Sequence, residues 1–326
     1  MRRSISEFNR PDKRLRGEKG FALLLSLLVL LLLTVLILEV DFQTRADLRA
    51  AGNFRDDLRA FYLARSAVTA GQALLKDDLL HGASYDALDE LWAYPFPEYP
   101  LGDGTLTAAI TDESGKINLN LLVDPQNGKK VDARVEQLRR LFDLLQLDRK
   151  WVDPLVDWLD KDTDPLPFGA ENETYQRLDP PYSSQDGPFD TLEELHMVKG
   201  ITDEVYRKIA PYVTVYGGPN DKININTADT SVLQSLDEGI DETTARRIIE
   251  NRPFGNENVA TKFRNSVSEA IYNHMVDKDV RSIDWVGYQS KLFSITAEGK
   301  VNGIRKIIHA VVRRGNKMEL LYFKVE

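Results

Sequence analysis

Residues 18–40 of the chain read EKGFALLLSLLVLLLLTVLILEV. The 18 residues from Phe21 to Leu38 carry no charge, and only Ser26 and Thr34 interrupt the apolar run. A run of this length can cross the hydrocarbon core of a bilayer as one helix. No other segment of the 326 residues approaches it, so the sequence predicts one membrane span.

The segment before this run carries a net positive charge, and the rest of the chain carries a net negative charge. Residues 1–19 hold seven basic and three acidic side chains, a net charge of +4, which leaves −13 for the rest of a chain whose total is −9. Positive charge tends to stay cytoplasmic, so we expect the leader inside and the body exported. A plain signal anchor is an alternative. A cleaved secretory signal is disfavoured because the run is too long and has no small-residue exit before Asp41.

The helical pattern continues beyond the apolar run. Apolar residues recur three or four positions apart, with Arg and Asp on the other side, which is typical of one face of a helix. Phe21 to about Leu79 as one helix would be about 90 Å long, and Gly52 and Gly71 are its weak points. The recurring residues are Leu48, Ala51, Phe54, Leu58, Phe61, Val68 and Leu75.

Overall composition narrows the class of protein. Hydrophobic residues make up 42% and charged residues 29% of the chain, which indicates globular structure with room for two packed units. Cysteine is absent, which excludes disulfides, thiolate nucleophiles and cysteine metal sites. The acidic balance argues against a general nucleic-acid-binding protein.

Four short stretches predict a small antiparallel sheet. Thr105–Thr111, Leu292–Ala297 and Glu319–Val325 alternate, and Ile304–Arg313 is rich in Ile and Val. Segments 298–303 and 314–317 are the expected hairpin turns. The residues between the first and second strands read mostly helical, with Thr202 and Asp229 or Thr230 as helix caps. The predicted fold is therefore α+β, with a long N-terminal helix packed on the sheet and a large inserted helical subdomain.

The leader ends at Glu18-Lys19-Gly20 before Phe21, and this resembles the prepilin peptidase site of type IV pilins and type II secretion pseudopilins. The resemblance implies cleavage after Gly20 and methylation of the new N-terminus at Phe21. The fifth mature residue is Leu25, where most pilins carry a glutamate thought to pair with the N-terminus of a neighbouring subunit. Its absence is typical of the large minor pseudopilin, protein K.

Three further segments are similar to the protein K family of type II secretion minor pseudopilins: DESGKINLN at 112–120, LEELHMVKGIT at 192–202 and ININTA at 223–228. The resemblance implies a non-enzymatic tip component that helps to initiate pseudopilus assembly. It implies other minor pseudopilins, the prepilin peptidase and the inner-membrane secretion platform as partners. The expected location is the bacterial inner membrane, with one span and a periplasmic body.

The expected division is a leader (1–20), the N-terminal helix (21–80), a strand frame (81–112 and 285–326) and a helical insertion (113–284). From the residues alone, a minor pilin of a type IV pilus and a membrane-anchored DNA receptor stay open as alternatives.

Acidic residues gather at 153–173. Asp160, Asp162, Asp164 and Glu171 occupy positions 1, 3, 5 and 12 of a loop, the spacing of an EF-hand, although Pro165 replaces the glycine of position 6. A solvated acidic face is the alternative. Because protein K is known to bind calcium in its helical domain, the resemblance favours a structural Ca²⁺ ion. The candidate ligands are Asp157, Asp160, Asp162, Asp164, Glu171 and Glu173.

Residues 224–249, and more weakly 198–209, resemble the helix-hairpin-helix of DNA receptors. Such hairpins usually have a basic flank, but residues 191–252 hold 7 basic and 11 acidic side chains. We therefore expect packing or protein contact and no nucleic-acid partner.

Motifs for catalysis are lacking in the sequence. The four histidines are isolated, and the chain has no Gly-x-Ser-x-Gly elbow, Walker loop or HExxH. The sequence therefore favours a non-enzymatic protein.

Overall fold

The apolar run and the amphipathic stretch after it form one helix in the computed structural model, which describes residues 14–255, 259–276 and 286–326. Helix α1 (Arg14–His81) begins inside the predicted leader, and neither Gly52 nor Gly71 interrupts it. Its Gly20–His81 part contains an 18-residue window with a mean hydropathy of 3.2, none of it buried. By length and composition this helix can cross a membrane. Leader residues 1–13 lie outside the described residues.

The chain divides into two units, one ending at Leu58 and the other comprising Arg59–Glu326. The first is helical throughout its described part, and its apolar side chains from Phe21 to Val40 are exposed. The last turns of α1 belong to the second unit, which contains all the strands and the other helices described.

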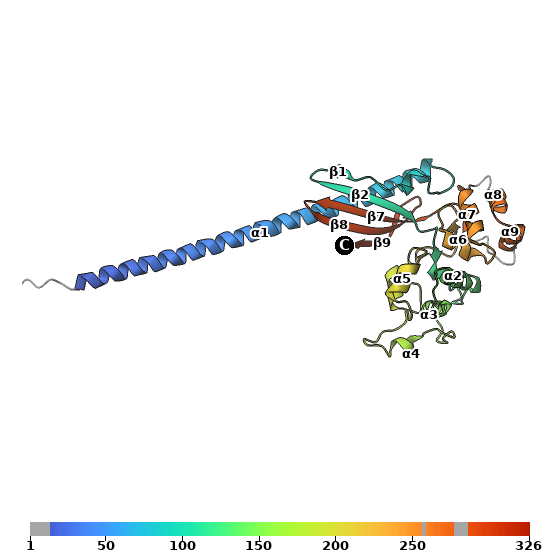
Figure 1. The fold of residues 1–326 in the computed structure, drawn as a ribbon, viewed down its shortest axis with the longest axis horizontal. Helices are drawn as coiled ribbons and strands as arrows, with labels where there is room; N and C mark the ends of the chain where they lie inside the picture. Colours follow the sequence, from blue (N-terminus) through green and yellow to red (C-terminus); the bar gives the residue numbers. More distant parts are fainter. Residues whose placement is uncertain (1–13, 256–258, 277–285) are drawn as a thin grey trace, which may run out of the picture. The chain divides into compact units, whose positions relative to one another are not determined.

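An antiparallel five-stranded sheet organises the second unit, and its strands are labelled in Figure 1. The order across the sheet is β1-β2-β7-β8-β9. The long-helix-on-sheet part of the predicted α+β fold is thereby confirmed. The bounds are β1 (Tyr99–Leu101), β2 (Gly104–Asp112), β7 (Leu292–Val301), β8 (Ile304–Arg313) and β9 (Glu319–Val325).

Small residues let α1 lie close to this sheet. Ala64, Ala67 and Gly71 are buried against it, and a Cβ on Gly71 would meet the Ile295 side chain at 3.2 Å. Larger neighbours complete the core, since Leu75 of the helix and Phe293 of β7 are fully buried in the same cluster. Close packing of this kind fixes how the helix crosses the strands.

The prediction of a turn at 298–303 was too long. Strand β7 continues to Val301, and only Asn302 and Gly303 form the turn, with φ of 48° and 85°. Gly299 lies within the strand because the helix backbone approaches it: a Cβ there would be 2.1 Å from the Ala60 carbonyl oxygen. The glycine therefore serves close packing and not a turn.

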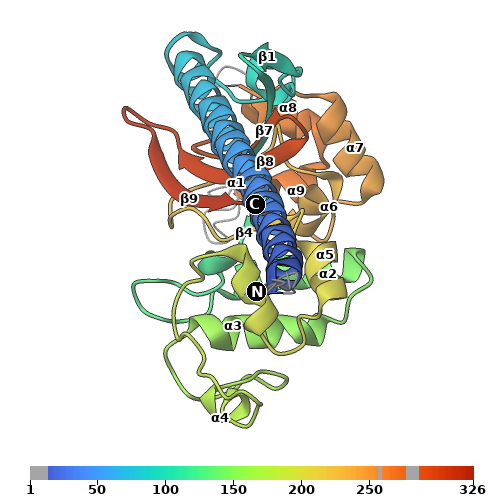
Figure 2. The ribbon, with the colours of Figure 1, turned by 90° about the vertical axis from the view of Figure 1, so that its left-hand side faces the viewer.

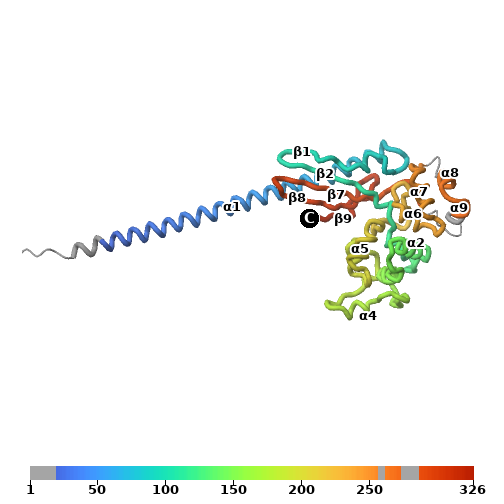
Figure 3. The backbone as a smooth tube through the Cα atoms, in the orientation of Figure 1, coloured from blue at the N-terminus to red at the C-terminus, as the bar shows by residue number. Residues whose placement is uncertain are grey.

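Residues 113–291 lie between β2 and β7 and form the insertion, whose path Figure 3 follows. It is largely helical, as predicted, and α2 packs against α6 (Figure 2). Thr202 and Asp229 accept backbone N–H groups as helix caps, as expected. The helices are α2 (Asp132–Leu144), α3 (Asp153–Leu159), α4 (Asn172–Tyr175), α5 (Asp203–Ile209), α6 (Thr230–Leu236), α7 (Glu242–Glu250), α8 (Val259–Ser266) and α9 (Glu269–Val276).

Shorter elements complete the insertion. The sequence Lys-Ile-Asn occurs at 116–118 and at 222–224. These segments form β3 (Ile117–Asn118) and β5 (Ile223–Asn224), which pair in parallel with β4 (Val213–Thr214) and β6 (Val286–Gly287). The 3₁₀ helices are η2 (Leu119–Leu121), η3 (Arg149–Val152) and η4 (Leu192–Met197), and η1 (Leu91–Ala93) precedes β1. The expected boundary between residues 284 and 285 lies outside the described residues.

The insertion has its own apolar core. Leu138 and Phe142 of α2 are fully buried with Val156 of α3 and Leu233 of α6. The apolar residues of the helix-hairpin-helix-like segment, such as Ile248, belong to the same core. Packing therefore accounts for the apolar pattern of that segment.

A buried polar network joins the insertion to the sheet. The Asp112 carboxylate at the end of β2 accepts hydrogen bonds from Thr227 Oγ1 (2.5 Å), Ser290 Oγ (2.5 Å) and Asn224 Nδ2 (3.2 Å). Burial raises the pKa of Asp112 to about 6, and these hydrogen bonds oppose that rise. Because an unpaired buried carboxylate is costly, the hydrogen bonds fix these segments in one arrangement.

The same network contains a buried arginine. Arg314, which follows β8, donates to Asp78 Oδ2 (2.6 Å) and to the Ser290 carbonyl oxygen (2.9 Å), and it also pairs with Asp86. One guanidinium therefore links the end of α1, the segment after it and the segment that enters β7.

Candidate metal centre

Helix α3 and the loop after it form the acidic region. The helix begins at Asp153 with Pro154 in its first turn, where proline is tolerated. At Asp160 the backbone turns to the extended conformation, with φ −80° and ψ 177°, so the helix ends there. Residues 160–171 then return to α4, which brings Glu171 back to the end of α3.

The carboxylates of Asp160, Asp162 and Glu171 converge at this point. One oxygen atom from each lies within 4.8 Å of the others. Asp160 is 7% exposed and Glu171 is 6% exposed, while Asp162 faces solvent. The structure therefore brings together three of the six ligands predicted from the sequence.

The buried oxygens of this group lack hydrogen-bond partners. Within the described residues, neither oxygen of Glu171 nor Oδ1 of Asp160 has a donor. Glu171 occupies the N-cap position of α4 but does not cap that helix with its side chain. Buried anionic oxygens without donors are costly, and a cation is the group that would satisfy them.

Burial and mutual repulsion raise the pKa of both buried acids. Burial is the largest cause for Asp160, followed by the charges of Asp162 and Asp157, and its pKa reaches about 7. Burial also dominates for Glu171, with the charges of Asp157 and Asp160 next, and its pKa is about 7. The neighbouring negative charges that contribute to these shifts would attract a divalent cation.

The other three predicted ligands have different surroundings. Both Asp157 oxygens accept the Leu166 N–H, at 3.3 and 3.2 Å, and Oδ2 also accepts the Ala170 N–H at 2.8 Å. Asp164 is exposed. Glu173 is exposed and pairs with Arg177. The geometry therefore does not place Glu173 or Asp164 at the cluster, and Asp157 binds the loop backbone instead.

Asp186 was not predicted as a site residue. Its charge contributes to the raised pKa of both Asp160 and Glu171. Ser184 Oγ donates to Asp186 Oδ1 at 2.6 Å and Asn172 Nδ2 donates to Oδ2 at 3.3 Å, which holds the side chain in place. Asp186 lies 15 residues beyond Glu171 in the chain, so the loop-spacing motif could not identify it. Its backbone is left-handed, with φ 50°, which the sequence also did not indicate.

The donor set fits calcium. Ca²⁺ takes six to eight oxygen ligands and accepts irregular carboxylate geometry. Asp160, Asp162 and Glu171 offer carboxylate oxygens only, two of the three residues are buried, and no described cation pairs with their unpartnered oxygens. No EF-hand helix pair surrounds the loop, since α4 has only four residues.

A second acidic group, Asp78, Asp86 and Glu90, is already neutralised in part. Arg314 pairs with Asp78 and Asp86, and the Trp92 indole N–H and Ala87 N–H donate to Glu90. This group therefore has an arginine and other donors as partners, whereas Asp160 Oδ1 and both Glu171 oxygens have none among the described residues.

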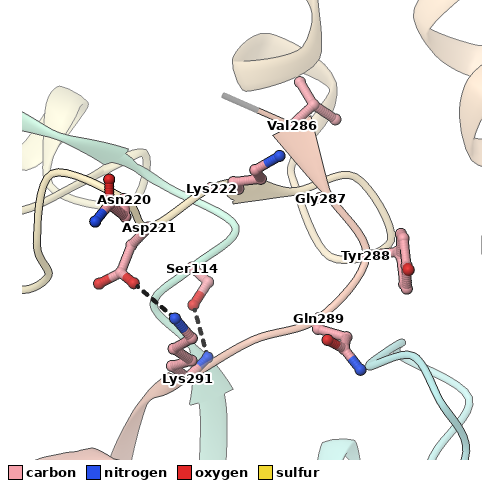
Figure 4. Close-up of a pocket in the computed structure, with 9 residues that line it drawn as sticks. All are labelled: Ser114, Asn220, Asp221, Lys222, Val286, Gly287, Tyr288, Gln289 and Lys291. Atoms are coloured by element: carbon pink, nitrogen blue, oxygen red, sulfur yellow. Dashed lines mark hydrogen bonds and ion pairs between the residues drawn. The ribbon is translucent and has the colours of Figure 1, made fainter. Parts of the chain in front are cut away.

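A separate pocket of about 290 Å³ opens beside the junction of the sheet and the insertion. Figure 4 shows the Lys291 ammonium directed toward Asp221, at 3.4 Å, and the Lys291 N–H directed toward Ser114 Oγ, at 3.3 Å. None of the acidic-loop residues lines it. The lining residues are Ser114, Asn220, Asp221, Lys222, Val286, Gly287, Tyr288, Gln289 and Lys291.

Two family models described as "Type II secretion system (T2SS), protein K" match residues 115–219 and 223–268. A protein of this name from Aeromonas hydrophila is 31% identical over 258 residues, which cover 73% of this chain and 77% of that protein. The chain belongs to the type II secretion system protein K family. A Pseudomonas aeruginosa member is 29% identical over 92% of this chain and 90% of its own length.

A solved protein K chain has the same fold. It comes from the crystal structure of the GspK-GspI-GspJ complex from enterotoxigenic Escherichia coli and matches with a TM-score of 0.71. The match covers 86% of this chain and 99% of that chain at 20% identity. Membership of the protein K family makes the chain a minor pseudopilin and favours the secretion system over the pilus alternative.

Proposed function

We propose that this minor pseudopilin occupies the tip of the pseudopilus and helps to initiate its assembly for protein export across the outer membrane. The observation that carries the proposal is Leu25, which gives an apolar, exposed side chain on α1 where a pilin glutamate would pair with a neighbouring N-terminus. A subunit without that carboxylate suits the end of a fibre, where no subunit stands above it.

The partners proposed are other minor pseudopilins and the inner-membrane secretion platform. Support comes from the solved relative, whose crystal contains a GspK-GspI-GspJ complex. The role proposed is structural assembly and not catalysis. Gold labelling of this subunit on overproduced pseudopili should mark one end of each fibre, and labelling along the length would contradict the tip position.

Before assembly, the prepilin peptidase is proposed to cut between Gly20 and Phe21 and to leave a methylated N-terminus. The mature chain then stays in the inner membrane through α1, with its acidic body in the periplasm. The intact mass of the membrane-bound protein should correspond to a methylated chain that starts at Phe21. Gly20→Val should leave the full-length chain, whereas normal maturation of that variant would refute the peptidase assignment.

A structural Ca²⁺ ion is proposed at Asp160, Asp162 and Glu171, with Asp186 close by. The ion would supply the positive charge that the buried, unpaired carboxylates lack. Calcium should raise the melting temperature of the protein, and Asp160→Asn with Asp162→Asn should abolish the rise. Glu173→Gln is the matched control, because this exposed acid pairs with Arg177. Equal stabilisation of all three proteins would exclude the site.

A further inference from the structure

Two carboxylates of α3 hold the acidic loop by its backbone. Asp153 and Asp157 are four residues apart and therefore on one face of the helix. Asp157 accepts the N–H groups of Leu166 (3.2 Å) and Ala170 (2.8 Å), and Asp153 Oδ2 accepts the N–H of Phe168 (3.3 Å). Alternate amides of the loop thus bind one side of α3.

Contacts on both sides make this arrangement rigid. Arg139 donates to Asp153 Oδ1 at 2.8 Å, and Lys199 Nζ donates to the Gly169 carbonyl oxygen at 3.0 Å. Gly169 lies so close to α3 that an added Cβ would be 1.7 Å from Asp157 Oδ2. The loop therefore has little freedom at the residues that precede Glu171.

Asp157 has hydrogen bonds where Glu171 has none among the described residues. Its carboxylate already receives two backbone N–H groups, whereas the Glu171 oxygens receive none among the described residues. The hydrogen bonds therefore distinguish Asp157, which binds the loop backbone, from Glu171, whose oxygens are available to a cation.

We propose that Asp153 and Asp157 are positioning residues, which fold the 160–171 loop into its cation-binding form before a cation arrives. The inference rests on the proposed calcium site. In this proposal the loop becomes ordered when the protein folds, so the ligands are already in place when calcium binds. The free energy of calcium binding is then not reduced by the entropic cost of ordering the loop.

The test compares Asp157→Asn with Asp162→Asn in the full-length chain in detergent. Amide hydrogen exchange is measured in EGTA, and calcium affinity is measured by titration with calcium alone. Asp157→Asn should accelerate exchange at Leu166 and Ala170 at least about tenfold without metal and weaken calcium binding by about 10- to 100-fold. Asp162→Asn should weaken calcium binding with unchanged exchange in EGTA.

Unchanged amide exchange at Leu166 and Ala170 in Asp157→Asn would overturn the proposal. If that variant also lost calcium binding while its exchange stayed unchanged, Asp157 would be a direct ligand. Asp153→Asn provides a second measurement, at Phe168, if the first variant does not fold. If the wild-type protein binds no calcium, the metal site fails. The exchange comparison in EGTA still decides whether these two residues position the loop.

Discussion

At the scale of single residues, Asp160 and Glu171 should make calcium binding depend on pH. Their pKa values are raised to about 7 in the absence of metal, so protons compete with calcium below that pH. We expect calcium affinity to fall about 10- to 100-fold between pH 8 and pH 6, because each acid takes up a proton in that range. Calorimetric titration at the two pH values measures the change. An affinity independent of pH would show that neither acid is a ligand.

The same two acids should make the metal-free protein more stable as the pH falls. Ordinary pKa values are 3.8 for Asp and 4.5 for Glu, so the folded chain binds more protons than the unfolded chain between those values and about pH 7. The free energy of unfolding should therefore rise from pH 8 to pH 5.5 in EGTA. Urea denaturation measures it, with Asp160→Asn/Glu171→Gln as the control that should show a smaller rise. Stability that falls over this range would contradict the assignment.

How far the sequence predicts the candidate site depends on chain distance. Asp160, Asp162 and Glu171 were predicted because loop spacing relates residues close in the chain. Asp186 and the backbone-binding role of Asp157 were not, because both depend on how a loop folds back on α3. A spacing motif contains no information about which carboxylates will accept hydrogen bonds from backbone N–H groups.

At the scale of elements, the contact between α1 and β7 depends on small residues. Gly299→Ala would place a Cβ 2.1 Å from the Ala60 carbonyl oxygen, which is helix backbone and cannot move alone. We expect the free energy of unfolding to fall by about 2–3 kcal/mol, the cost of an overpacked core. Gly218→Ala is the matched control, since its nearest neighbour would be 3.9 Å away. Equal stability of the two variants, measured by urea denaturation, would contradict this packing.

The strands were largely predicted from sequence pattern, and the alternation in β2 and β7 reflects one buried face. The short strand β1 was missed, since Tyr99–Leu101 is exposed and includes a proline. The end of β7 was misassigned because Gly299 resembles a turn residue until the helix that requires it is in place.

At the scale of the whole second unit, Arg314 connects segments that are distant in the chain. Its side chain is 4% exposed, and its partners Asp78 and Asp86 precede it by more than 200 residues. Such a junction could not be predicted, because the sequence around Arg314 indicates only a hairpin turn.

Arg314→Met should therefore destabilise the protein strongly. It would leave the Asp78 and Asp86 carboxylates without their guanidinium partner, a loss of about 3–5 kcal/mol for a buried ion pair. Arg313→Met is the matched control: that side chain is 41% exposed and pairs with the exposed Glu319, so the expected loss is below about 1 kcal/mol. Urea denaturation of the full-length variants measures both. Similar losses for the two variants would show that the junction adds no stability.

The place where the insertion leaves the sheet has a consequence for evolution. Strands β2 and β7 pair directly over nine residue positions, and Asp112 lies opposite Phe293, so the insertion begins and ends at neighbouring points. A short hairpin could in principle bridge that gap, as in a simple two-strand ribbon. The insertion thus connects two strands that pair directly with each other. Its size could change between lineages without altering which strands pair.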